Sequence, residues 1–193
     1  MTKLTLYENI LTNVNRHIEL DDDESAFFVS LIQKKIIKKK DFLLKKGQIC
    51  GAVTFVNSGC LRSYYEDHSG THIIQFAEAN WWIGDLKSYV NGTSAQLYID
   101  ALLKTEVFQI SKSKVEDLYK RVPKFERFFR IQMENSLINH QDRILQSQTL
   151  KTKTRYENFV KTYPSFHQHI PLKDIASYLG VTPEHLSTIR ARY

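Results

Sequence analysis

The sequence predicts an α+β protein with helices at its start, an antiparallel barrel or sandwich of short strands, one long helix and a C-terminal all-α unit. Three observations predict this order. Short apolar runs separated by glycine turns fill residues 34–110, a pattern typical of antiparallel strands. Residues 124–150 contain neither glycine nor proline, so a long helix can continue through them. Residues 170–190 carry two short helical patterns around a glycine, which indicates two helices joined by a tight turn.

The composition is that of a globular protein. The 193 residues are 42% hydrophobic and 25% charged, close to the average of such domains. We find no signal-peptide pattern and no apolar run near the ~20 residues that a membrane helix needs. Cys50 and Cys60 are too few for a disulfide framework or a four-ligand metal site. We therefore expect a cytoplasmic protein without a membrane partner.

The first 33 residues carry two helical patterns, and the acidic stretch 21–25 between them suits the positive end of a helix dipole. Short apolar runs then follow at 34–40, 42–44, 53–56, 61–65, 72–76, 96–100 and 106–110. Glycine turns at positions 47, 59, 70 and 92 separate several of these runs, as in an antiparallel barrel or sandwich. The lysines of the first run flank apolar residues, so we interpret it as an exposed edge strand rather than a nucleic-acid patch.

A short helix from Lys114 to Val122 precedes the long helix, which carries two apolar stripes. One stripe repeats at seven residues like a coiled-coil seam; it comprises Ile131, Ile138 and Leu145, with Phe128 and Asn135 beside them. The other comprises Phe125, Phe129, Met133, Leu137 and Ile144. A helix with two apolar faces needs two partners. We assign one stripe to the protein's own barrel and the other to the same helix of a second subunit. The alternative buries both stripes within one subunit.

The C-terminal pattern is typical of a helix-turn-helix. The inward positions recur at helical spacing: Leu172, Ile175, Ala176 and Leu179, then Leu186 and Ile189. Gly180 can take the left-handed conformation that ends the first helix, and Thr182 with Pro183 suits the start of the second. Residues 151–193 carry seven Lys and Arg against three Asp and Glu, most of the +6 net charge. This favours a DNA partner over an ordinary helical hairpin.

In this order, the elements resemble the Crp/Fnr superfamily of transcription regulators, the relatives of the cyclic-AMP receptor protein. The resemblance covers essentially the whole chain, and its most specific segments are 170–190 and 82–101. It implies a cyclic-nucleotide-binding-like β-roll sensor (a jelly-roll, cupin-like double-stranded β-helix) at 1–122. It also implies a dimerisation helix at 123–150 and a winged-helix-like DNA-binding domain at 151–193. Because the sequence ends at Tyr193, we expect a reduced wing.

The resemblance identifies the effector pocket with Trp82, Gly84, Asp85, Leu86, Ala95 and Gln96. Family members hold a cyclic phosphate with backbone N–H groups and an arginine, and a ribose hydroxyl with a glutamate. Here Asp85 replaces the glutamate and Ala95 stands at the arginine's position. Burying a phosphate without a paired cation is costly, so we expect a degenerate pocket that does not bind cyclic AMP. Trp81, Trp82 and Tyr89 either fill it or line a site for another, unknown effector.

By the same resemblance, the second helix is the DNA-reading helix. The expected DNA contacts are Thr182, Glu184, His185, Ser187, Thr188, Arg190 and Arg192. Glu184 matches the family's glutamate, an acceptor for cytosine N4, whereas Pro183 and Thr188 stand where the prototype has arginines. The four cysteines of an oxygen-sensing iron–sulfur cluster are not present.

The sequence therefore predicts a homodimeric, sequence-specific DNA-binding transcription regulator with double-stranded DNA, and RNA polymerase, as partners. We find no catalytic constellation, no metal-ligand spacing and no cofactor motif, so we do not expect an enzyme. The alternative is a ligand-sensing signalling module whose helical tail binds a protein.

Overall fold

The computed structural model describes residues 6–164 and 168–191. Helices α1 (Glu8–Asn15) and α2 (Asp22–Ser30) open it. The carboxylate of Asp21 accepts a hydrogen bond from the Glu24 N–H at 2.8 Å, and the Glu24 carboxylate accepts one from the Asp21 N–H at 3.0 Å. This reciprocal cap satisfies two N–H groups that the first helical turn leaves unpaired. The acidic stretch 21–25 therefore starts a helix, as predicted.

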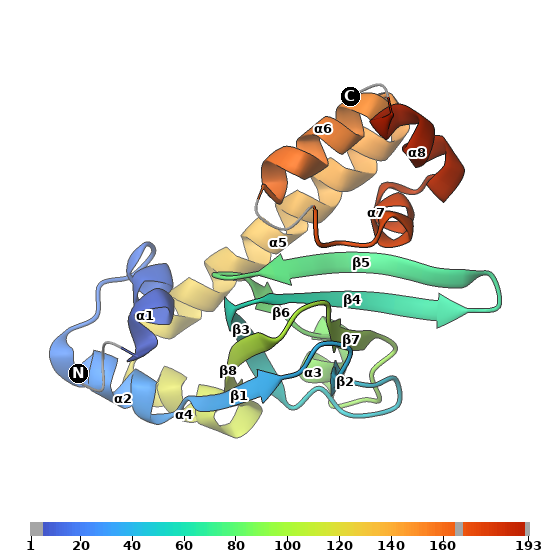
Figure 1. The fold of residues 1–193 in the computed structure, drawn as a ribbon. Helices are drawn as coiled ribbons and strands as arrows, with labels where there is room; N and C mark the ends of the chain where they lie inside the picture. The colour runs from blue at the N-terminus through green and yellow to red at the C-terminus, as the bar shows by residue number, and fades with distance from the viewer. Residues whose placement is uncertain (1–5, 165–167, 192–193) are drawn as a thin grey trace.

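Within the described residues, eight strands form the β-roll, which consists of two four-stranded antiparallel sheets (Figure 1). The strands are β1 (Gln33–Ile37), β2 (Phe42–Leu44), β3 (Ala52–Ser58), β4 (Cys60–Asp67), β5 (Gly70–Glu78), β6 (Trp82–Ile83), β7 (Tyr98–Ala101) and β8 (Thr105–Ser111). One sheet has the order β1-β8-β3-β6 and the other β2-β7-β4-β5. Strand β1 lies at the end of its sheet, which confirms the lysine-rich edge strand.

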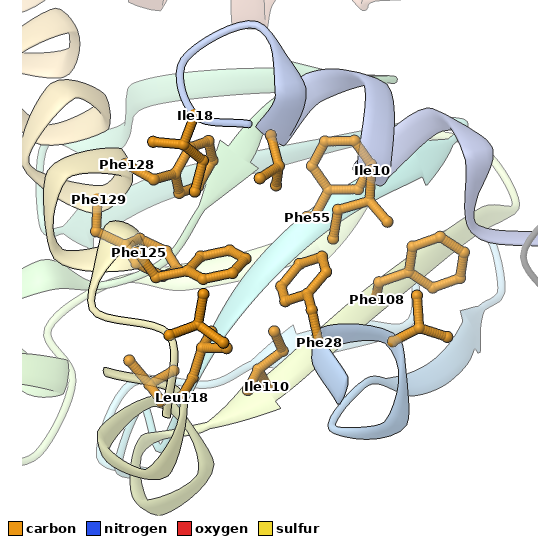
Figure 2. Close-up of a cluster of buried hydrophobic side chains, with 14 residues drawn as sticks. Ile10, Ile18, Phe28, Phe55, Phe108, Ile110, Leu118, Phe125, Phe128 and Phe129 are labelled. Atoms are coloured by element: carbon orange, nitrogen blue, oxygen red, sulfur yellow. The ribbon is translucent and has the colours of Figure 1, made fainter. Parts of the chain in front are cut away.

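Apolar side chains from both sheets fill the roll, and a second cluster joins it to the helices. The interior holds Val56, Leu61, Ile99 and Val107, each with no exposed surface. Outside the roll, rings from α2, β3, β8 and α5 meet in the cluster of Figure 2. In that cluster, Phe28 stacks on Phe125 with ring centres 4.7 Å apart. Aromatic pairs of this kind stabilise beyond the area that they bury, so the cluster anchors the helices to the roll.

The long helix of the prediction is present. Helix α4 (Lys112–Arg121) leads into α5 (Lys124–Thr149). Only the first turns of α5 are buried, and they include Phe125, Phe128 and Phe129. Phe128 has no exposed surface and packs on Trp82 with ring centres 5.7 Å apart. This corrects the expectation that Phe128 flanks a dimer seam, because α5 begins against the roll and its first turns complete the core.

The second stripe also differs from the expectation that one stripe packs along the protein's own barrel. Beyond Phe129, the stripe members Met133, Leu137 and Ile144 are 44–61% exposed. The reason is that, beyond its first turns, α5 lies across a groove from the roll, and residues of α5 and of strand β5 line that groove.

Three short helices complete the fold: α6 (Thr152–Thr162), α7 (Leu172–Leu179) and α8 (Pro183–Arg190). Helix α6 lies beside the far half of α5, and α7 lies between α8 and strand β5 (Figure 1). The α+β class with a β-roll followed by helices is confirmed. Each helix in the described part of the chain is too short or too polar to cross a membrane.

Candidate functional site

The turn between α7 and α8 has the geometry predicted from its sequence. Gly180 takes φ = 66°, the left-handed conformation, and the Val181 N–H donates to the Ala176 carbonyl at 3.0 Å. The Thr182 hydroxyl accepts the His185 N–H at 3.2 Å, and Pro183 occupies the first turn of α8. Glycine, cap and proline thus end one helix and start the next within a few residues.

Helix α8 buries one face and exposes the other. Leu186 has no exposed surface. Ile189, three positions later in the same helix, is half-buried. The exposed positions include most of the expected contacts: Thr182, Glu184, His185, Ser187, Thr188 and Arg190. Arg192 lies outside the described residues. The exposed set offers a carboxylate acceptor, a guanidinium donor and hydroxyls, which are groups that can read base edges or hold phosphates.

In the segment expected to form the effector pocket, the side chain of Asp85 binds backbone N–H groups of the protein itself. This carboxylate is buried and caps α3 (Leu86–Asn91), accepting the Ser88 N–H at 2.9 Å. Its other oxygen accepts the N–H groups of Gln96 and Leu97 at 2.9 and 3.2 Å. Both donors lie in the segment that the sequence resemblance assigns to the effector pocket. Asp85 therefore supplies the anion that these donors bind here.

Ala95 and Trp82 also contact neighbouring residues of the protein. Ala95 is buried, and its backbone bridges to the neighbouring loop, donating to the Gln48 carbonyl at 2.7 Å. The Trp82 indole packs between Phe55 and Phe129, with ring centres 5.2 and 5.5 Å away, and its N–H donates to Asn13 at 3.1 Å. Gly84 is half-buried, whereas Leu86 and Gln96 are exposed.

A large groove lies outside this segment. Its volume is about 860 Å³, and its walls come from β6, α3, α5, α6 and α7. Trp82 and Asp85 form part of one wall and Met133 part of another. Two expected seam residues of α5, Ile138 and Leu145, do not line the groove and are 52% and 58% exposed. Of the other expected seam residues, Ile131 is half-buried and Asn135 exposed.

A buried ion cluster links the roll to α7, and sequence reasoning did not find it. Arg62 on β4 donates from Nε and Nη2 to both oxygens of Asp100 on β7, at 2.8 and 2.9 Å. Its Nη1 donates to Asp174 on α7 at 2.5 Å. We call these three residues the Arg62 clasp. Burial raises the pKa of Asp174, and the Arg62 charge opposes that shift. The signal was hidden because 112 positions separate Arg62 from Asp174.

The cysteines are packing residues. Both Cys50 and Cys60 are free and buried. Burial raises the pKa of Cys60 to about 12, with the charge of Glu78 adding to the effect, so its thiol stays protonated and unreactive near neutral pH. Within residues 6–164 and 168–191, no group of three or more His, Cys, Asp or Glu side chains could hold a metal ion.

Comparison with known proteins agrees with this architecture. The cyclic nucleotide-binding domain family matches residues 34–122. The chain is similar to the Anaerobic regulatory protein of Haemophilus influenzae, with 26% identity over 83% of this chain and 66% of that protein. It is also similar to Electron transport regulator A of Shewanella oneidensis, with 24% identity over 94% of this chain and 74% of that protein. The chain thus spans about two thirds to three quarters of the length of these two relatives.

Solved structures share the fold. FixK2 from Bradyrhizobium japonicum superposes with a TM-score of 0.71 at 19% identity, covering 83% of each chain. The Catabolite Activator Protein of Thermus thermophilus superposes with a TM-score of 0.58 at 14% identity, covering 93% of this chain and 85% of that one. Residues 34–122 thus match the cyclic nucleotide-binding domain family, and the chain as a whole is similar to two regulatory proteins whose matched regions extend beyond the roll.

Proposed function

We propose that this protein is a homodimeric, cytoplasmic transcription regulator that binds specific DNA sequences through α8. In this proposal residues 1–122 form the sensor, 123–150 the dimerisation helix and 151–193 the DNA-binding domain. The observation that carries the proposal is the free outer face of α8, on which Glu184, Ser187, Thr188 and Arg190 are exposed. A helix with such a face fits the major groove when a second helix braces it, as α7 does here.

In this proposal, different residues of the outer face of α8 contact bases and phosphates. Glu184 lies in the first turn, where a carboxylate can accept from cytosine N4. Thr182, at the N-cap, and Arg190, in the last turn, are better placed for phosphates. His185 and Ser187 flank the row, and Arg192 remains an expected contact.

The dimer is supported by the open apolar surface of α5. Ile138, Leu145, Leu137 and Ile144 are each more than half exposed, and a soluble chain rarely leaves such a stripe uncovered. A second copy of the same helix covers it with matching periodicity and two-fold symmetry. Phe128 is left out of the proposed seam because it is buried in the roll's own core.

The sensor pocket is degenerate in this proposal. Asp85 accepts the backbone N–H groups of Gln96 and Leu97, and Ala95 offers a methyl group at the position where family members have the arginine that pairs a phosphate. A cyclic nucleotide would have to displace one anion and remain unpaired itself. The relatives are regulatory proteins, and no catalytic role is proposed.

The test is selection of binding sites from a random duplex pool with the full chain. We expect enrichment of a palindrome whose half-sites lie about 10 base pairs apart, centre to centre, because two α8 helices of a symmetric dimer meet successive turns of one groove. A pool that stays random after several rounds would contradict the proposal and favour a helical tail that binds a protein.

A further inference from the structure

The C-terminal helices are fixed to the β-roll of their own chain, and the Arg62 clasp is the centre of that contact. Its side chains are shielded from solvent: Asp174 is 3% exposed, Asp100 9% and Arg62 18%. Arg62 binds Asp100 within the roll through Nε and Nη2, and it binds Asp174 of α7 through Nη1. A guanidinium held by a bidentate pair has a fixed plane, so it defines where Asp174 must lie.

Helix α7 also completes the free edge of strand β5. One turn beyond Asp174, the Ser177 hydroxyl accepts the Ile73 N–H at 3.0 Å and donates to the Thr71 carbonyl at 2.7 Å. Arg143 of α5 donates to the Ile74 carbonyl at 2.7 Å. Strand β5 ends its sheet, and an edge strand presents unpaired backbone groups. Side chains of two helices therefore pair with consecutive parts of that edge, which fixes the register of α7 along β5.

An aromatic cluster lies under these polar contacts. Phe76 of β5 has no exposed surface, and its ring centre lies 5.9 Å from those of Phe159 and Tyr163 and 5.4 Å from that of Tyr178. Trp81 packs on Tyr163 at 5.4 Å. Apolar contact provides most of the attraction between α7 and the roll, but it does not fix their relative orientation because the hydrophobic effect is non-directional. The Arg62 clasp and the hydrogen bonds at the edge of β5 fix that orientation.

The outer face of α8 takes no part in this docking. The described residues of that face remain exposed while α7 is buried against β5, and Figure 1 shows α8 on the side of α7 away from the strand. The docked arrangement thus leaves the reading surface open and sets its angle to the roll.

We propose that Arg62 and Asp174 are positioning residues that hold α8 at a fixed orientation, so that the two reading helices of a dimer are preset to one half-site spacing. This inference rests on the proposed function. Binding at two linked sites depends on how well the linkage matches the span between them, and holding a group in its bound orientation lowers the cost of binding. Loosening the clasp should therefore weaken two-site binding and relax its spacing requirement, without changing contact with a single half-site.

The variant that isolates the contact is Asp174→Asn. It removes the interdomain charge, keeps the side chain's shape and leaves the Arg62–Asp100 pair intact. The matched control is Asp117→Asn, which changes an exposed carboxylate of α4 that lies 4.0 Å from Lys120. If Asp174→Asn fails to fold by circular dichroism, Ser177→Ala replaces it, because it removes two edge hydrogen bonds of the same contact.

The selected palindrome is titrated as duplexes in which half-site spacing is varied, beside a duplex with one half-site. For wild type and Asp117→Asn we expect a single preferred spacing. For Asp174→Asn we expect about tenfold weaker binding at that spacing, a flatter spacing profile and single half-site affinity within about twofold of wild type. An unchanged spacing profile, or equal losses on every duplex, would overturn the inference.

Hydrogen exchange without DNA separates this inference from the proposed function. The Ile73 N–H donates to the Ser177 hydroxyl of α7, so it should exchange about tenfold faster in Asp174→Asn. Exchange in the central strand β8 should not change. Equal exchange at Ile73 in both proteins would refute the clasp, even if wild type bound DNA as proposed. Failure of wild type to bind any duplex would refute DNA reading and hence the positioning role.

Discussion

Replacing Ile138 by Asp should split the proposed dimer, and the size of the effect follows from its exposure. Ile138 is 52% exposed in a single chain. Fully burying an isoleucine side chain is worth about 1.5–3 kcal/mol, so covering the exposed half contributes about 1 kcal/mol per subunit. An aspartate at the same place must also be buried without a partner, which costs about 3–5 kcal/mol. Symmetry applies both terms twice.

Even half of that sum, about 4 kcal/mol, raises the dissociation constant about a thousandfold. Sedimentation velocity at micromolar concentration should then show a dimer for wild type and a monomer for Ile138→Asp. The matched control is Ile36→Asp on the edge strand β1, where the isoleucine is 55% exposed but lies away from α5. The reasoning is refuted if Ile138→Asp remains a dimer, or if Ile36→Asp dissociates equally.

Three further outcomes are expected. Cyclic AMP and cyclic GMP should bind no better than about millimolar in calorimetry, because Asp85 already accepts the backbone N–H groups of Gln96 and Leu97 and Ala95 cannot pair a phosphate. Micromolar binding of either nucleotide would contradict this. Glu184→Ala should reduce the discrimination between bases at one position per half-site by about 1–3 kcal/mol. Arg190→Ala should weaken binding to all duplexes alike and lower the magnitude of the slope of log affinity against log salt concentration by about one. The reverse pattern would mean that α8 is docked in the opposite direction. The Asp67 carboxyl, which accepts from the Ser69 hydroxyl at 2.6 Å and contacts His72 at 3.1 Å, should titrate at a pKa of about 2 by carbon NMR, with Ser69 the larger cause of the lowering and His72 adding to it. Its stabilising effect is thus present above the ordinary value near 3.8 and lost as pH falls toward about 2; Ser69→Ala should raise the midpoint, and an unchanged midpoint would show that the hydroxyl is not the cause.

Local rules were enough to predict the elements that depend on neighbouring residues. Asp21 and Glu24 cap α2 reciprocally, and Gly180, Thr182 and Pro183 build the turn before α8. Each of these features is decided within four positions of the chain, where backbone conformation and hydrogen-bonding capacity determine the result. The strands could be predicted for a similar reason, since the short apolar runs and the glycine turns between them limit where a barrel strand can end.

Features that depend on distant packing could not be predicted. Phe128 and Ile138 look alike in a heptad pattern, yet one is buried under Trp82 and the other is half exposed. The difference arises because only the first turns of α5 are buried in the core, and no local signal marks where that burial ends. Arg62 shows the same limit, since a lone arginine in a strand gives no indication of Asp100 or Asp174 as partners.

Asp85 is an intermediate case. The replacement of the family's glutamate was visible in the sequence and indicated a changed pocket. That its shorter carboxylate turns inward to bind the N–H groups of Gln96 and Leu97 required the fold of the loop. The residues at positions 85 and 95 therefore predict a pocket that does not bind cyclic AMP, and the geometry of the loop supplies a physical argument for that prediction.

The most direct test of the central claim is a salt titration of the selected palindrome beside a duplex of the same composition in shuffled order. A regulator that reads bases through α8 should bind the palindrome at least about a thousandfold more tightly. Both affinities should fall linearly with salt on logarithmic axes, because phosphate contacts release counterions. Equal affinity for the two duplexes at every salt concentration, or no binding to either, would contradict sequence-specific DNA binding by this protein.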